Sequence, residues 1–143
     1  MQNEKEAEIL CYRILILIFG LLGYPPQLMQ TTQLNIERQS ASNGDTLVTR
    51  LTGKLSLETV HNFIATMRPE PATRLVLDMS GLSFLDSAGV GALVSLFVSR
   101  RNNSKTLALA ALTQQGNAVM QVSGLLKLMP VYSSVEEAVS KRP

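Results

Sequence analysis

The alternation of apolar and polar residues between positions 33 and 55 predicts an antiparallel hairpin. Leu34 and Ile36 alternate with polar residues, and the alternation resumes from Leu47 to Leu51. The residues at 42–45, Ser-Asn-Gly-Asp, are typical of a turn. We therefore expect two paired strands at this point of the chain.

A helix is expected next, followed by a buried strand. Ser56 is a predicted N-cap, and Pro69 and Pro71 end the helix. The continuous apolar run at 75–77 is typical of a strand that is buried on both faces. Apolar residues recur at helical spacing between 57 and 67: Leu57, Val60, Ile64 and Met67.

The remaining pattern predicts an alternation of helices and strands. The segment 106–112 reads as a central strand, a short helix ends at Gly124, and residues 130–134 form an edge strand. Ser134 and Glu137 form a capping-box pattern that opens a last helix. The expected fold is therefore α/β, a small mixed sheet flanked by helices. The apolar faces of the three helices after residue 87 are expected at Val90, Leu93, Val94, Phe97 and Val98, at Ala118, Val119 and Val122, and at Val135, Ala138 and Val139.

The amino-terminal segment has a different pattern. Residues 14–22 are almost purely apolar, but Arg13 precedes them and Pro25 ends the run. A helix over residues 9–22 would be about 21 Å long, short of the ~30 Å hydrocarbon core, so we expect no membrane span. Acidic residues precede the run and no small-residue cleavage site follows it, so a secretory signal is not expected either.

Three interpretations of this segment stay open. It is an extra apolar helix that packs on the domain or on a second copy in a homodimer, a weak membrane-surface anchor, or an accessory extension without a role, with Met29 as the true start. We treat residues 1–30 as an accessory segment and residues 31–143 as a single domain, because 143 residues suit one core.

Composition narrows the functional classes. The net charge of +2 gives no reason to expect a direct nucleic-acid partner, and the pair Arg100 and Arg101 is explained by a helix C-terminus. One Cys and one His are too few to form a metal-binding site, and one Cys cannot form an intramolecular disulfide, so no metal or cofactor is expected. We interpret Cys11 as a small hydrophobic residue of a protein in a reducing compartment, and this interpretation favours a cytoplasmic location.

Ser87 is the residue with the most chemical interest, since it stands between an apolar run and a predicted helix. A hydrolase would need Asp86 and His61 to activate it, but Asp86 is adjacent in sequence and His61 lies in no motif. Gly89 and Gly91 lack the third glycine of a dinucleotide site. From the local pattern, Ser87 or Asp86 is a helix cap. The same position also suits a phosphoserine, because a helix N-terminus stabilises negative charge.

The stretch "LVLDMSGLSFLDSAGVGAL" resembles the signature of STAS domains, the family of bacterial anti-sigma-factor antagonists. The similarity extends from about Gln33 to Val139. It implies a regulator that is not an enzyme and that carries a phosphorylatable serine directly after the Asp, here Ser87. Unphosphorylated, such a protein binds an anti-sigma factor that is also a serine kinase; phosphorylation releases it, and a phosphatase resets it.

On this resemblance we expect Ser87 to be the phosphorylation site. The predicted partner-binding residues are Leu85, Asp86, Ser87, Gly89, Val90 and Ser56. Two interpretations of Asp86 stay open: it caps the helix, or it positions the serine for the kinase. An unphosphorylated scaffold that acts through dimerisation or a membrane-associated complex is the alternative function.

Two departures from the family pattern bear on these expectations. Ala88 stands where many relatives have a second hydroxyl, which leaves Ser87 as the only acceptor in the motif. Lys54 and Ser56 stand near the turn where antagonists commonly carry an acidic residue, so kinase docking is expected to differ from the usual mode or to be absent.

Overall fold

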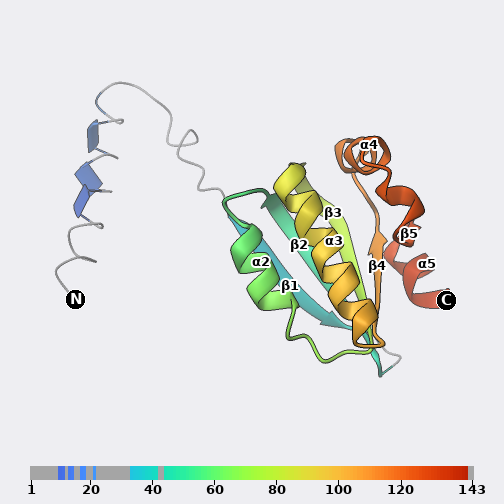
Figure 1. Ribbon diagram of the computed structural model, residues 1–143. Coiled ribbons are helices and arrows are strands. Elements are labelled where there is room, and N and C mark those ends of the chain that lie inside the picture. The colour runs from blue at the N-terminus through green and yellow to red at the C-terminus, as the bar shows by residue number, and fades with distance from the viewer. Residues whose placement is uncertain are drawn as a thin grey trace. The chain divides into compact units, whose positions relative to one another are not determined.

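The structure is a computed structural model that describes residues 10, 11, 13, 14, 17, 18, 21, 33–41 and 44–141. The chain divides into two compact units, residues 1–31 and 32–143. The second unit holds the sheet and its helices (Figure 1).

The predicted hairpin is present. Strands β1 (Leu34–Ser40) and β2 (Thr46–Leu55) pair antiparallel, with Ile36 opposite Leu51. Gly53 has a φ of +110°, and a Cβ on it would lie 2.2 Å from the backbone oxygen of Gln33. Only glycine therefore fits where the end of β2 passes the start of β1.

Three further strands complete a mixed sheet of five in the order β1-β2-β3-β4-β5. Strands β3 (Arg74–Leu85), β4 (Thr106–Ala110) and β5 (Val131–Tyr132) add in parallel to β2. Leu75, Val76 and Leu77 are all completely buried, as the continuous apolar run predicts. The expected fold class is confirmed.

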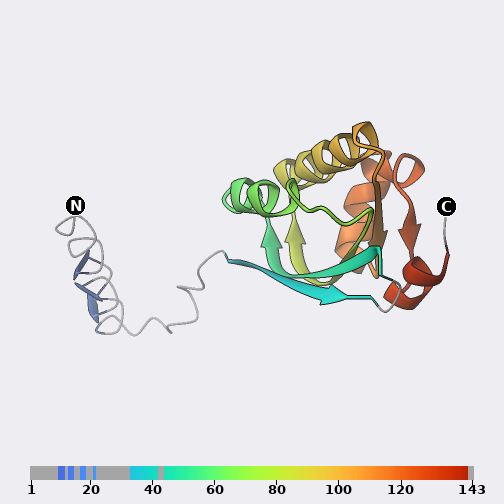
Figure 2. The ribbon, with the colours of Figure 1, turned by 90° about the horizontal axis from the view of Figure 1, so that it is seen from below.

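Side chains of β3 alternate between two apolar cores. Leu75 and Leu77 belong to the larger core, which also takes Phe63 of α2 (Val60–Met67) and Leu93 of α3 (Ser87–Asn102). Val76 belongs to a smaller core on the opposite face, which α5 (Val135–Ser140) covers. Figure 2 shows α2 and α3 together on one side of the sheet.

The start of α2 differs from the expectation. Ser56 was predicted as its side-chain cap, but the helix begins at Val60, and the Ser56 hydroxyl is buried without a hydrogen-bond partner. The Ser56 carbonyl accepts the first N–H groups instead, from Thr59 and Val60. Leu57 consequently lies before the helix and is 73% exposed, so it is not part of the buried face.

The predictions of the apolar faces of two other helices were only partly right. In α4 (Gln114–Val122) the buried residues are Gly116 and Met120, whereas Ala118 and Val122 are exposed. Thr113 caps α4 by accepting the Gly116 N–H, and this cap sets a register that the apolar residues alone did not reveal. In α3, Val98 is exposed and Leu96 is buried. The stop at Gly124 is confirmed by its left-handed conformation.

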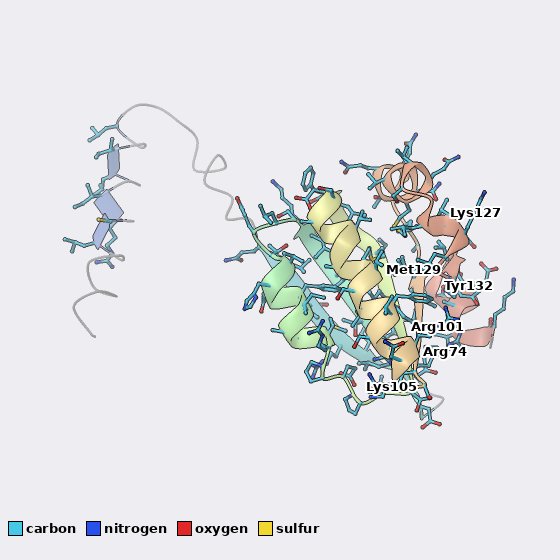
Figure 3. The ribbon with its side chains drawn as sticks, viewed as in Figure 1. Arg74, Arg101, Lys105, Lys127, Met129 and Tyr132 are labelled. Atoms are coloured by element: carbon cyan, nitrogen blue, oxygen red, sulfur yellow. The ribbon has the colours of Figure 1, made fainter. Side chains whose placement is uncertain are left out.

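The last helix is held at both ends. Ser134 caps α5 by accepting the Glu137 N–H. Hydrogen bonds from Lys141 and Ser133 to the Glu137 carboxylate lower its pKa to about 2. At the other end, Arg74 donates to the carbonyl oxygens of Ala138, Val139 and Lys141 (Figure 3).

Arg100 and Arg101 lie in the last turn of α3, as expected, but Arg100 is buried. Its guanidinium donates to the carbonyl oxygens of Thr106 at 2.9 Å and Ala72 at 2.5 Å. Burial lowers the pKa of this guanidinium. Arg100 therefore joins α3 to the loop between α2 and β3 and to the start of β4, a role beyond the favourable dipole interaction.

Within the first unit, the described residues are helical. The large apolar side chains among them are all exposed: Leu10, Ile14, Leu17, Ile18 and Leu21. No helix among the residues that the structure describes is long and apolar enough to cross a bilayer.

Candidate functional site

The candidate site lies at the edge of the sheet where the parallel strands β2 and β3 end. Leu55 and Leu85 are register partners at this edge, and the backbone N–H of Asp86 donates to the Leu55 carbonyl at 3.3 Å. Ligand and partner sites of parallel sheets commonly form at such carboxyl ends. The signature residues Asp86 and Ser87 follow directly.

Asp86 is the cap of α3. Its Oδ1 accepts the backbone N–H of Gly89 at 2.9 Å, and its backbone is extended, as an N-cap requires. Ser87 is the first residue of the helix and is exposed. The sequence left either Asp86 or Ser87 as the cap of this helix. The cap is Asp86, and the Ser87 hydroxyl is not needed for it.

Asp86 makes a second contact that the sequence did not predict. Its Oδ2 accepts the backbone N–H of Leu57 at 3.1 Å, from the loop between β2 and α2. The same loop is closed internally by Thr59, whose hydroxyl donates to the Lys54 carbonyl at 2.8 Å and accepts the Ser56 N–H at 3.0 Å. One carboxylate thus ties this loop to the start of α3.

A groove borders Asp86, the residue before Ser87, on the side of the β2–α2 loop. The apolar side chains in it are Leu57, which is 73% exposed, and Phe84, which is 39% exposed. These are the surface residues that sequence reasoning missed. Strand alternation would not have found Phe84, because it lies two residues after the buried Leu82 and the pairing of β2 with β3 shifts register at this point. The groove is lined by Lys54, Ser56, Leu57, Glu58, Phe84 and Asp86.

Four of the predicted partner-binding residues lie beneath the surface. Leu85, Val90, Gly89 and Ser56 are buried. Leu85 and Val90 fill the larger core, because strand and helix turn these positions toward the sheet. Leu85 and Val90 thus support the site from the core, whereas Asp86 and Ser87 reach its surface.

Gly89 is required by close packing. A Cβ at this position would lie 2.4 Å from the carbonyl oxygen of Leu55 and 2.8 Å from the Leu85 Cδ1. Gly91, two residues further along α3, faces open space. The first glycine therefore lets the helix start directly against the strand end, which places Ser87 at the edge of the sheet.

The hydrolase alternative finds no support in these contacts. Both carboxylate oxygens of Asp86 accept backbone N–H groups, and His61 is exposed on α2. In the described part of the chain, no group of three His, Cys, Asp or Glu side chains is placed to hold a metal ion.

Comparison with known proteins agrees with the signature. The STAS domain family matches residues 37–138. An anti-sigma F factor antagonist from Paenibacillus polymyxa is 23% identical over 113 residues, which cover 76% of this chain and 96% of that protein.

Comparison with solved structures also finds anti-sigma factor antagonists. The anti-sigma factor antagonist SpoIIAA in its unphosphorylated form is 25% identical, with a TM-score of 0.61, and the match covers 75% of this chain and 93% of that one. The Bacillus cell fate determinant SpoIIAA in its phosphorylated form is 27% identical, with a TM-score of 0.54 and coverages of 75% and 96%. A sulfate transporter family protein from Wolinella succinogenes shares the fold at 13% identity and a TM-score of 0.61, with coverages of 70% and 85%.

We predict that Gly89→Ala destabilises the protein by about 1–3 kcal/mol, because its methyl group meets backbone that cannot yield. Gly91→Ala is the matched control in the same helix. It should be neutral or stabilise by up to about 1 kcal/mol, since alanine favours a helix and the position is open. Urea unfolding measures both, and equal stabilities of the two variants would contradict the packing argument.

Proposed function

Because this chain belongs to the STAS domain family, we propose that it is an anti-sigma-factor antagonist that is switched at Ser87. In its unphosphorylated form it binds an anti-sigma factor that is also a serine kinase. Phosphorylation of Ser87 releases it. A phosphatase that acts on phosphoserine resets it, and the exchange takes place in the cytoplasm.

The position of Ser87 is the observation that carries this proposal. Its side chain is exposed at the first position of a helix of sixteen residues, while Asp86 supplies the cap. A kinase can therefore transfer the γ-phosphoryl group of ATP to the hydroxyl oxygen without unfolding the domain. The hydroxyl proton passes to the base of the kinase and ADP leaves; hydrolysis of the phosphate ester by the phosphatase restores the hydroxyl and yields inorganic phosphate.

Electrostatics explains how the phosphate acts as a switch. A phosphoserine carries about −1.5 to −2 charges, and the unpaired N–H groups at the start of α3 stabilise it in the free protein. Burial of that charge in an interface without a partner costs several kcal/mol. A cost of about 3 kcal/mol lowers affinity about a hundredfold.

The residues around Ser87 indicate the contact surface. Leu57 and Phe84 line a groove with Asp86, the residue next to Ser87, and Lys54 and Glu58 line the same groove. The exposed apolar pair supplies contact area, and the two opposite charges supply orientation. A partner that covers this groove also covers Ser87, so the phosphate and the partner exclude each other.

An unphosphorylated STAS scaffold is the second candidate. The exposed apolar residues of the first unit favour it, among them Leu17 and Leu21, because such side chains generally need a partner surface. In that case the segment 1–30 makes a homodimer or meets a membrane-associated complex, and Ser87 is never phosphorylated.

The first test is phosphopeptide and intact-mass analysis of the protein from its native host. We expect a phosphate of about 80 Da on Ser87, with an occupancy that changes under stress, and none in Ser87→Ala. Unmodified Ser87 in cells whose anti-sigma kinases are active would contradict the proposed switch.

Ser87→Asp separates the two candidates. We expect it to weaken binding to the purified anti-sigma kinase of the host by about tenfold or more, because the carboxylate imitates part of the phosphate charge. Ser87→Ala should bind as the unaltered protein does. Isothermal titration measures both, and a scaffold would bind its partner equally with either residue.

Removal of residues 1–30 tests the role of the first unit. If this segment makes a dimer, the full chain has twice the mass of one chain in light scattering and the truncated chain has the mass of one. An unchanged monomeric mass before and after truncation would count against dimerisation through this segment.

A further inference from the structure

We propose that Asp86 is a positioning residue through which the phosphorylation state of Ser87 reaches the loop between β2 and α2. The inference deepens the proposed function and rests on it. In this view the phosphate does more than occupy the interface. It also breaks the hydrogen bond that the backbone N–H of Leu57 donates to Asp86. Leu57 is one of the two residues with exposed apolar side chains in the groove.

The contacts of Asp86 make it the link. Its Oδ1 holds Gly89 in α3, the helix that begins with Ser87, and its Oδ2 holds Leu57, which is 29 residues away in sequence. Both bonds depend on the same carboxylate group. Any force that moves or rotates the carboxylate therefore acts on both elements at once.

The loop has few other contacts at Leu57. The hydrogen bonds of Thr59 secure the Lys54 carbonyl and the Ser56 N–H, and the Ser56 carbonyl accepts from Thr59 and Val60. These bonds fix both ends of the loop. The N–H of Leu57 is held by Asp86, and the Leu57 side chain is 73% exposed, so packing adds little to hold it.

A phosphate on Ser87 acts on this link in two ways. Its negative charge lies on the residue next to the Asp86 carboxylate, and like charges repel. Its oxygens also compete for the N–H groups at the start of α3, which Asp86 now caps. The other charged side chains of the groove, Lys54 and Glu58, are opposite in sign and give no net positive charge to cancel the repulsion. The Leu57 N–H loses its acceptor as a result.

The experiment measures amide hydrogen exchange at Leu57 by NMR in the full chain. Phosphoserine is installed at position 87 during translation, so no kinase is needed. We compare four proteins, with Ser87 bare or phosphorylated and with position 86 unaltered or carrying Asp86→Asn. In the unaltered background, phosphorylation should speed Leu57 exchange about two- to tenfold, the effect of losing one hydrogen bond.

Asp86→Asn separates the two bonds of the carboxylate. The single carboxamide oxygen of Asn can still accept from Gly89, and Asn caps helices about as well as Asp. Its NH₂ group cannot accept the Leu57 N–H. We therefore expect fast Leu57 exchange in this variant whether or not Ser87 is phosphorylated, with α3 amides such as that of Val94 still protected.

Thr113→Ala is the matched control for a general loss of stability. It removes the cap bond of α4 to Gly116, at a helix start that makes no contact with Asp86 in the described hydrogen bonds. Phosphorylation should still speed Leu57 exchange in this variant. A purely structural role of Asp86 would give the same phosphate response with Asp86→Asn as with Thr113→Ala.

Two results would overturn the inference. One is equal Leu57 exchange with bare and phosphorylated Ser87 in the unaltered background, and the other is a phosphate effect that persists in Asp86→Asn. Neither result refutes the switch itself, which depends on whether phosphorylation occurs in the host and weakens kinase binding. Loss of the coupling and loss of the proposed function are therefore observed separately.

Discussion

The carboxylate of Asp86 is the contact on which the candidate site depends. It accepts one N–H group from α3 and one from the β2–α2 loop, while its own N–H donates to the end of β2. Two regions that are distant in sequence, residues 55–57 and 86–89, thus meet in one residue. Gly89 completes the arrangement, because its missing side chain lets α3 begin against Leu55. Together these two residues hold the start of α3, and with it Ser87, at the edge of the sheet.

Much of the fold follows from local patterns. The hairpin, the buried run at 75–77 and the left-handed stop at Gly124 were all predictable, since each depends on alternation or on one special residue. Helix faces were less predictable. The cap at Thr113 fixes the register of α4, and Met120 rather than Val122 turns inward. Apolar spacing alone does not reveal which residue begins a helix.

The candidate site was predictable only where the signature is contiguous. Asp86 and Ser87 stand together in sequence, and the resemblance named them. Leu57 belongs to a loop 29 residues earlier, and the pairing of β2 with β3 together with the Oδ2 contact of Asp86 brings it to the site. Ser56 was misread because a serine before an apolar run looks like a cap, while here its carbonyl begins the turn and its hydroxyl is buried.

Arg74 has a consequence for how the chain folds during synthesis. It begins β3, yet its guanidinium binds carbonyl oxygens 64–67 residues later, at the end of α5. The smaller core, which includes Val76 and Ala138, has the same long separation in sequence. The Arg74 contacts are complete only once Lys141 is available, and the smaller core only once Ala138 and Val139 are available. The larger core, on the face that carries Ser87, uses described residues no later than Val131, so on the nascent chain it can assemble before the opposite face closes.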